Sequence, residues 1–173
     1  VIASLVKRMR REEPELMIRI ISRDKDLTQL IDDNVELFDA HKGSTVVPDD
    51  VFKTQGMNIP PAMVGDILAM MGDTSDNIQG VPGIGPKTAA KLIMEYGSIE
   101  GVYENIDNIK GKRKENLLAS RDILKRSREL VTLKEDVDFD FELLETKSDP
   151  TVWDIDAITS LFRKLGFNRF PDD

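Results

Sequence analysis

The first residues of the chain alternate apolar and basic positions with the spacing of an amphipathic helix. The apolar positions are Val1, Ile2, Leu5, Val6 and Met9, which predicts a helix from residue 1 to about residue 11. No capping residue precedes it, so we expect the chain to open inside a helix. The apolar run 16–21 then predicts a short buried strand, which ends at the polar residues 22–26.

Strand and helix patterns continue to alternate up to residue 71. Residues 35–38 and 45–47, separated by Gly43, predict a strand and a shorter partner, and Pro48 begins a helix through Phe52. A further helix follows Ile59-Pro60-Pro61. Its apolar face contains Met63, Ile67, Leu68, Met70 and Met71, and we expect its methionines to pack in a core. This alternation predicts an α/β layer.

Helical spacing dominates the rest of the chain, which predicts an α-helical appendage. We expect Ser98 to cap a helix that contains Ile99, Val102 and Tyr103, and residues 115–131 to form one longer helix. The inward positions of that longer helix are Leu117, Leu118, Ile123 and Leu124. Residues 132–133 and 137–141 are predicted to be extended. Pro150 then breaks the chain before a last helix through Ile155, Ile158, Leu161 and Phe162, with Gly166 as C-cap and Trp153, Phe167 and Phe170 as anchors.

One stretch, residues 72–92, places acidic residues directly before a glycine-rich turn. Asp73 and Asp76 are three positions apart in a polar loop, a spacing that can direct both carboxylates to one hard cation such as Mg²⁺. Gly80, Gly83 and Gly85 follow, and we expect them to let the backbone approach another molecule closely. The amides that open a helix at residues 86–88 would then face an anion such as phosphate.

A second acidic pair follows the predicted strand 16–21. Asp24 and Asp26 lie where open α/β sheets bind ligands, and both can reach one cation if the chain turns there. Lys25, between them, is expected to screen the carboxylates or to contact a phosphate. The alternative interpretation is a helix N-terminus that favours negative charge.

Composition limits the kinds of function. The 173 residues are enough for one domain with an appendage, and they contain no cysteine and a single histidine, His41, which excludes thiolate and histidine-rich zinc sites. No apolar run approaches a bilayer span, so we expect no membrane association. The lack of cysteine favours a reducing, cytoplasmic location.

Net charge is −8, but it is unevenly distributed. Residues 79–131 hold 10 Lys and Arg against 7 Asp and Glu, whereas the regions before and after are acidic. Basic residues cluster at Lys110, Lys112, Arg113 and Lys114, and again at Arg121, Lys125, Arg126 and Arg128. For any single one of them, a solvated helix face is as good an interpretation as a phosphate contact.

The turn G-V-P-G-I-G resembles a helix-hairpin-helix, which grips a nucleic-acid backbone without reading bases. Joined to G-D-T-S-D-N, it resembles more specifically the helix–three-turn–helix region of the 5′ nucleases, the flap endonuclease family that includes the N-terminal domain of bacterial DNA polymerase I. The likeness also covers I-I-S-R-D-K-D-L-T-Q-L and L-F-R-K-L-G-F. It implies an α/β fold: the C-terminal part of a PIN-like sheet, followed by a helix-hairpin-helix subdomain.

The resemblance implies a division of the chain and a metal site. Residues 1–78 would be a partial catalytic region, 79–131 the DNA-binding region, and 132–173 a strand and helix that complete the domain. Asp24, Asp26, Asp73 and Asp76 would hold Mg²⁺ or Mn²⁺ for two-metal phosphodiester hydrolysis.

The resemblance also implies partners. Gly83, Gly85, Lys87, Thr88 and Lys91 would contact duplex DNA beside a 5′ flap, and backbone carbonyls of the turn would hold a monovalent cation such as K⁺. Lys110, Lys112, Arg113 and Lys114 would add backbone contacts. The family acts in DNA replication and repair, with a fused or cooperating polymerase.

The chain departs from the family pattern at its beginning. Further metal-binding acids and the first strands of the family's sheet precede the position that matches Val1, so we expect a fragment with weak activity by itself.

Three alternatives remain. A glycine-bearing turn between two packed helices needs no ligand. Asp24-Lys25-Asp26-Leu27-Thr28 matches the D-x-D-x-T loop of haloacid dehalogenase phosphatases, in which Asp24 would be a covalent nucleophile. A DNA-binding module without catalysis is the third.

Overall fold

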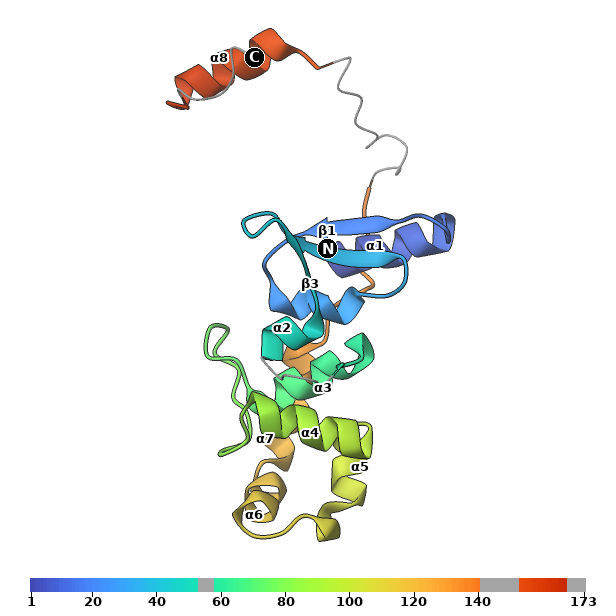
Figure 1. Cartoon of the computed structure of the whole chain (residues 1–173), viewed down its shortest axis with the longest axis vertical. Coiled ribbons are helices and arrows are strands. Elements are labelled where there is room, and N and C mark those ends of the chain that lie inside the picture. Colours follow the sequence, from blue (N-terminus) through green and yellow to red (C-terminus); the bar gives the residue numbers. More distant parts are fainter. Residues whose placement is uncertain (53–57, 141–152, 168–173) are drawn as a thin grey trace. The chain divides into compact units, whose positions relative to one another are not determined.

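The structure, a computed structural model, describes residues 1–52, 58–140 and 153–167 (Figure 1). It divides into one unit of residues 1–138 and a second of residues 139–173. Within the described residues no helix is long and apolar enough to cross a membrane. The elements of the first unit are α1 (Ile2–Glu12), β1 (Ile18–Ile21), η1 (Lys25–Leu30), β2 (Val35–Asp39), β3 (Ser44–Val46), α2 (Pro48–Phe52), α3 (Pro61–Met71), α4 (Pro86–Tyr96), α5 (Ile99–Glu104), η2 (Ile106–Asn108), α6 (Lys112–Ala119) and α7 (Arg121–Val131).

A three-stranded sheet with the order β1-β2-β3 forms one end of this unit (Figure 1). β1 and β2 are parallel with Ile18 opposite Val35, and β3 is antiparallel to β2. One face of the sheet packs on α1 and on η1, a 3₁₀ helix, around buried Ile20, Leu37 and Leu27. The sheet therefore has one small apolar core on one side.

The strand predicted within residues 16–21 is present as β1, but it is buried on one face only. Ile18 and Ile20 are buried, whereas Met17 and Ile21 are 66% and 68% exposed. Side chains alternate between the two faces of a strand, and in the described structure the core covers only one face. A continuous apolar run thus does not guarantee burial on both sides.

The helical half of the unit is built around α3, which packs against α4, α7 and η1. Val64, Ile67 and Leu68 of α3 are completely buried, and Met70 is buried with them. Met63 and Met71 pack on the same core. The expectation that these methionines serve packing is confirmed.

Two predictions for the region after α5 were wrong. Residues 115–131 form two helices, α6 and α7, because the backbone leaves helical geometry at buried Ser120. Leu117 and Leu124 face the core as expected, but Leu118 faces solvent. Thr132 is extended, as predicted, although residues 132–140 belong to no strand. The Ser4 hydroxyl of α1 donates to the Lys134 carbonyl (2.9 Å) and accepts from the Val137 amide (3.2 Å), which fastens this segment to α1.

The second unit contains helix α8 (Ile155–Lys164), which agrees with the predicted last helix. The Asp154 side chain caps it by accepting from the Ala157 amide, and Gly166 follows it with φ +82°. The rings of Phe162 and Phe167 meet edge to face at 5.8 Å. Residue 141, Pro150 and Phe170, to which earlier expectations apply, lie outside the described residues.

Two glycines bring the end of α3 against the start of the glycine-rich turn. A Cβ on Gly80 would lie 2.3 Å from the Met71 carbonyl carbon, and a Cβ on Gly72 would lie 2.3 Å from the Gly80 nitrogen. The Val81 amide donates to the Met70 carbonyl (2.9 Å) beside this contact. Gly80 therefore serves a close approach within the chain and not, as predicted, to another molecule.

We expect Gly80→Ala to lower the free energy of unfolding by about 3 kcal/mol, because the added methyl would overlap backbone that has no room to move. Gly85→Ala is the matched control, since a Cβ there has no atom within 4 Å and Gly85 has an ordinary negative φ. Chemical denaturation of both variants measures the difference. Equal stability would show that the Gly72–Gly80 approach is not tight in solution.

Candidate acidic centre and nucleic-acid interface

Asp24 and Asp26 are positioned by the turn that follows β1. The Asp24 carboxylate accepts from the Asp26 amide (3.0 Å) and so caps the N-terminus of η1. This is the capping geometry of the alternative interpretation. Asp24 is exposed and Asp26 is partly buried, so the cap leaves both carboxylates near the carboxyl end of β1.

Asp73 and Asp76 lie on a tight loop between α3 and the glycine turn. Asp73 and Ile78 exchange backbone hydrogen bonds of 2.8 and 2.7 Å, which closes residues 73–78 into a small hairpin. Asp73 is 7% exposed, and its Oδ1 accepts from the Ser75 amide (2.9 Å) and hydroxyl (2.5 Å). Asp76, at the outer side of the loop, is exposed.

An ion pair between Lys25 and Asp73 joins the two acidic stretches. Burial would raise the pKa of Asp73, but the hydrogen bond from Lys25 and those from Ser75 outweigh it and hold the pKa at about 2. The same ion pair outweighs the burial of Lys25 and raises the pKa of its ammonium. Both groups are therefore charged at neutral pH.

Asp26 has the least satisfied carboxylate of the group. Its Oδ1 is buried and has no hydrogen-bond partner among the described residues. Burial raises the pKa of Asp26, and the negative charges of Asp24, Asp73 and Asp76 raise it further, against the opposing effect of Lys25. The other three predicted aspartates are thus all close enough to Asp26 to influence its charge.

Hard oxygen donors and an orphaned buried carboxylate oxygen fit a divalent cation such as Mg²⁺ or Mn²⁺. This fit concerns the chemistry of the donor atoms and not their positions. Within residues 1–52, 58–140 and 153–167, no three acidic or histidine side chains lie close enough together to form a ready metal site. The ligand roles of Asp24, Asp26, Asp73 and Asp76 stay a prediction.

The glycine turn after the acidic loop leads into α4. Gly83 has φ +75°, and Gly85, the N-cap of α4, is open on the side where a Cβ would point. The amide of Lys87 lies in the first helical turn, where no carbonyl of the helix can accept from it. Glycine is a favoured N-cap residue, and the open space beside Gly85 is compatible with the predicted close approach of another molecule.

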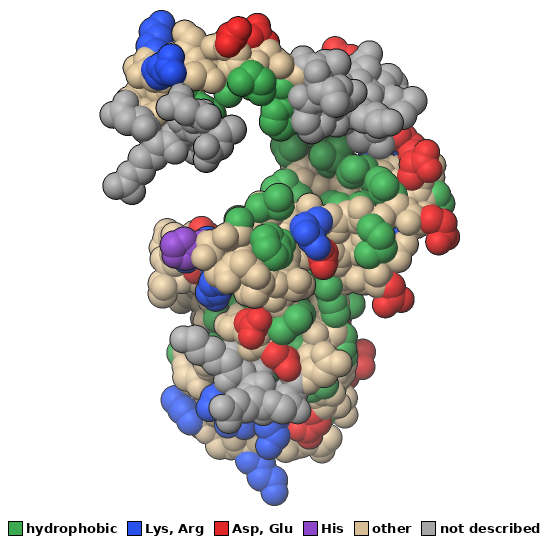
Figure 2. Space-filling model, turned by 45° about the horizontal axis from the view of Figure 1, so that its top comes forward, with side chains coloured by type: hydrophobic (Ala, Val, Ile, Leu, Met, Phe, Trp, Pro, Cys, Tyr) green, Lys and Arg blue, Asp and Glu red, His purple; other side chains and the backbone are tan. Residues whose placement is uncertain are grey.

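A groove of about 510 Å³ brings the predicted basic residues of two helices together. It is lined by Lys87, Thr88 and Lys91 of α4, by Lys110, which precedes α6, and by Arg113 of α6. Asn116 of α6 donates to the Pro82 carbonyl (2.8 Å), which ties α6 to the glycine turn. Figure 2 shows Lys and Arg side chains gathered at the lower end of its view, the end that carries the helices of this unit.

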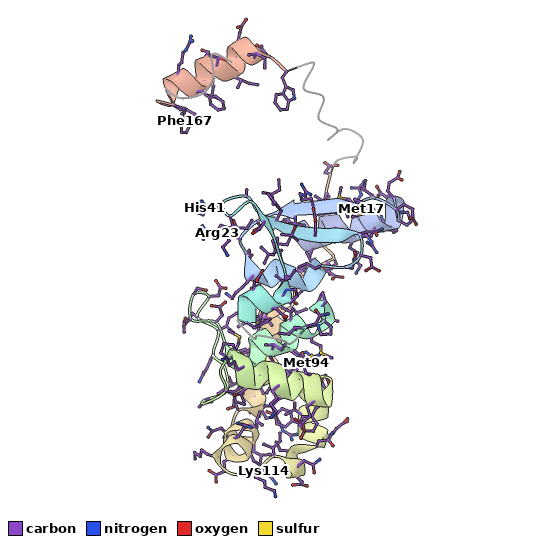
Figure 3. The ribbon with its side chains drawn as sticks, in the orientation of Figure 1. Met17, Arg23, His41, Met94, Lys114 and Phe167 are labelled. Atoms are coloured by element: carbon purple, nitrogen blue, oxygen red, sulfur yellow. The ribbon has the colours of Figure 1, made fainter. Side chains whose placement is uncertain are left out.

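The remaining two members of the predicted basic cluster are paired within the chain. Lys112 contacts Glu115 at 2.9 Å, and Lys114 contacts Asp107 at 2.7 Å. Figure 3 shows Lys114 at the helical end of the unit, far from Met17 on the sheet. The structure thus divides the four residues into two that line the groove, Lys110 and Arg113, and two that neutralise neighbours.

Helix α7 supports the acidic loop and α3. Ser127 donates its hydroxyl hydrogen to the Gln79 carbonyl (2.6 Å), and Arg128 pairs with Asp66 (3.0 Å) and with Glu100. Arg121 lies over the Tyr103 ring at 4.6 Å. Sequence reasoning missed Ser75, Ser127 and Asn116, because a short polar side chain signals its role only through its partner.

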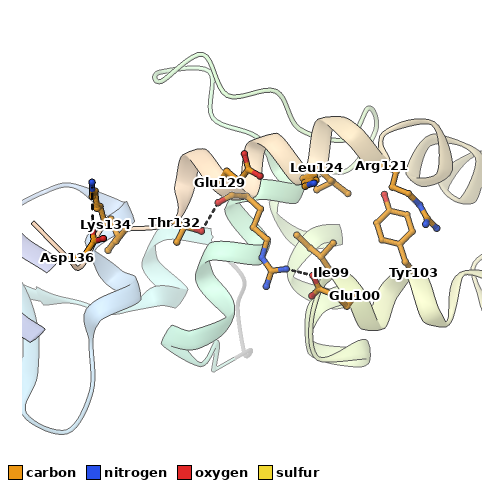
Figure 4. Close-up of a pocket in the computed structure, with 12 residues that line it drawn as sticks. Ile99, Glu100, Tyr103, Arg121, Leu124, Glu129, Thr132, Lys134 and Asp136 are labelled. Atoms are coloured by element: carbon orange, nitrogen blue, oxygen red, sulfur yellow. Dashed lines mark hydrogen bonds and ion pairs between the residues drawn. The ribbon is translucent and has the colours of Figure 1, made fainter. Parts of the chain in front are cut away.

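A pocket of about 810 Å³ lies between α5 and α7 (Figure 4). Ile99 and Leu124 line its apolar part, and the Arg128–Glu100 ion pair lies at its edge. Arg121, Lys125 and Arg128 of the second basic cluster line it, but none of the four aspartates does, so it is separate from the acidic centre.

We expect Asp26→Asn to raise the free energy of unfolding at pH 7 by about 1 kcal/mol, as is common when a charge at a functional site is removed. The pKa of Asp26 is higher in the folded protein than in the unfolded chain. Ionisation of Asp26 therefore destabilises the fold at pH values above the folded-state pKa. Below the pKa of the unfolded chain Asp26 is protonated in both states and has no such effect. The gain should therefore vanish below about pH 3.8. Thermal unfolding from pH 3 to 8 measures it, with exposed Asp33→Asn as control; a variant no more stable than wild type at pH 7 contradicts the charge repulsion.

The comparisons with solved structures concern nucleases. The T5 5′-exonuclease with bound zinc aligns with a TM-score of 0.61 at 28% identity, over 75% of this chain and 47% of that one. The bacteriophage T5 flap endonuclease, in a pseudo-enzyme-product complex with DNA and metal ions, gives the same values. This likeness confirms the predicted fold class, a PIN-like α/β sheet followed by a helix-hairpin-helix subdomain.

Sequence relatives and a family model agree with the fold. DNA polymerase I of Rhizobium leguminosarum is 44% identical over 127 residues, 73% of this chain and 12% of that protein. The Bacillus caldotenax enzyme of the same name is 36% identical over 166 residues, 93% of this chain and 18% of that protein. The chain thus spans less than a fifth of these relatives. The family model "5'-3' exonuclease, C-terminal SAM fold" matches residues 59–153, which include the acidic loop and the glycine turn. Because this match covers more than half of the chain, the chain belongs to the 5′-3′ exonuclease family.

Proposed function

We propose that this chain is part of a structure-selective 5′-3′ exonuclease and flap endonuclease that hydrolyses DNA phosphodiester bonds with divalent metal ions, in DNA replication and repair. One observation carries the proposal. The loop that bears Asp73 and Asp76 runs directly into the glycine turn, and the Gly72–Gly80 contact fixes the two together. An acidic centre is thereby joined to a backbone-binding element.

The four aspartates would hold the metal ions, which when bound supply an activated water and neutralise the leaving oxygen. Asp73 and Asp76 enter from the loop after α3, and Asp24 and Asp26 from the turn after β1. An all-oxygen set favours Mg²⁺ or Mn²⁺ over Zn²⁺. Backbone carbonyls of the glycine turn would hold a monovalent cation such as K⁺.

The groove between α4 and α6 would bind the DNA backbone beside a 5′ flap. Neither Lys87 nor Lys91 forms an ion pair within the described part of the chain, and both are exposed. Gly83 and Gly85 would let a phosphate approach the amides at the start of α4. Such contacts give affinity with little sequence preference.

The predicted regions follow from these roles. Residues 1–78 contribute the acidic centre, residues 79–131 bind DNA, and residues 132–173 complete the domain. A polymerase, fused or cooperating, is the proposed partner, since the relatives named above are DNA polymerases I.

A DNA-binding module without catalysis is the second candidate, because no three ligand side chains converge in the described residues. Metal-independent duplex binding without cleavage would support it. Family membership favours the nuclease over a haloacid dehalogenase phosphatase, which leaves the glycine turn without a role.

Replacing the groove lysines should weaken DNA binding. We expect Lys87→Ala with Lys91→Ala to lower duplex affinity about 10-fold at low salt and to reduce the slope of log affinity against log salt by about 2, because each phosphate contact releases counterions. Fluorescence anisotropy on one flap duplex measures both.

The matched control is Lys112→Ala with Lys114→Ala, which removes the same charge from residues already paired with Glu115 and Asp107. Its effect should be smaller in both affinity and slope. If the two double variants behave alike, the groove does not bind the DNA.

Replacing an acidic ligand should abolish cleavage. We expect Asp24→Asn and Asp76→Asn each to lower Mg²⁺-dependent cleavage of a 5′-flap duplex at least about 100-fold, since loss of a ligand carboxylate removes several kcal/mol of metal-ion catalysis. A gel assay with Asp33→Asn as control measures this, both on the chain, for which we expect weak activity, and on a full-length family protein that contains it. Cleavage that survives either substitution removes that carboxylate from the mechanism.

A further inference from the structure

Lys25 supplies the positive charge of the acidic centre. It lies between Asp24 and Asp26 in the sequence, yet its ammonium contacts Asp73, 48 positions away. Asp26 and Asp76 also act on it electrostatically. Among the ion pairs of the described residues, no other Lys or Arg is paired with any of the four aspartates.

One ammonium group cannot neutralise the charge of four carboxylates. Lys25 occupies Oδ2 of Asp73, while the buried Oδ1 of Asp26 has no partner within the described chain. A divalent ion carries twice the charge and accepts six or more oxygen ligands, so it can serve both groups at once. An ammonium and a divalent ion on the same Asp73 Oδ2 would repel each other at short range, so binding of the ion there favours departure of the ammonium.

We propose that Lys25 is a resident counter-cation that holds the acidic centre together without metal and that a divalent ion must displace from Asp73. The proposal rests on the metal site proposed above. Metal binding is then an exchange of ammonium for metal, and Lys25 lowers the metal affinity while it stabilises the metal-free protein. A purely structural ion pair would instead stabilise the fold with no effect on metal affinity.

Lys25→Met tests the exchange, because methionine keeps an unbranched apolar stem and removes the charge. We expect the variant to unfold at a lower temperature without metal, since the carboxylates then repel one another unopposed. In calorimetric titration it should bind Mn²⁺ about 10-fold more tightly than wild type, because repulsion between the ammonium and the ion is gone. Saturating Mn²⁺ should raise its unfolding temperature by more than it raises that of wild type.

Lys42→Met is the matched control. Lys42 also faces an aspartate, Asp39, at 3.9 Å, but this pair lies in the turn after β2 and includes no residue of the acidic centre. Its Mn²⁺ affinity should equal that of wild type. If wild type binds Mn²⁺ and Lys25→Met binds it equally or more weakly, the exchange is wrong and the metal site stands. If neither protein binds Mn²⁺, the metal site and the exchange are both wrong.

A second measurement avoids any folding defect in Lys25→Met. Side-chain ¹⁵N NMR of the wild-type protein follows each lysine ammonium during titration with diamagnetic Mg²⁺. The Lys25 signal should move at saturation to the position of a solvent-exposed lysine, while the Lys42 signal stays unchanged. A Lys25 signal that does not move when Mg²⁺ is bound overturns the exchange.

Discussion

The close backbone approach of Gly72 and Gly80 is the constraint on which the rest of the site depends. It fixes where the acidic loop leaves α3 and where the chain re-enters the helical core at Val81. Asp73 is held on one side of this contact, and the glycine turn that opens α4 begins on the other. The elements proposed to bind metal and DNA are therefore placed by one packing contact, which α7 supports through Ser127.

Charge at the acidic centre and charge at the groove are balanced in different ways. At the centre, four carboxylates act on one another and a single lysine opposes them, so Asp26 resists ionisation while Asp73 ionises readily. In the groove, Lys87 and Lys91 of α4 are exposed and form no ion pair with the described residues, although acidic residues are numerous in the chain. The acidic centre thus keeps uncompensated negative charge, opposite in sign to the proposed metal ion, and the groove keeps uncompensated positive charge, opposite in sign to the proposed DNA phosphates. Uncompensated charge of this kind is typical of functional sites.

Most of the fold could be predicted from the sequence, because apolar periodicity and capping residues are local signals. Ser98 caps α5, and the α3 helix opens at Pro61, as expected. The failures involved tertiary contacts. The break at Ser120 and the docking of residues 132–138 on α1 depend on partners far away in the sequence, and Gly80 could be assigned to an intramolecular contact only once Met71 was seen beside it. Spacing and family resemblance nominated the candidate site residues, but the pairing of Lys25 with Asp73 has no local signal at all.

The metal-free acidic centre illustrates a trade between stability and function. Burying Asp26 without a hydrogen-bond partner costs free energy that a structural role would not require, because an amide or an apolar side chain would fill the same place without charge. A cation at this oxygen would recover that cost. Lys25 neutralises Asp73 and leaves Oδ1 of Asp26 without a partner within the described residues, so the ion of the proposed exchange would contact both groups after the ammonium leaves. An incompletely neutralised cluster of this kind would bind a divalent ion more readily than a fully paired one, since fewer existing bonds would have to be broken.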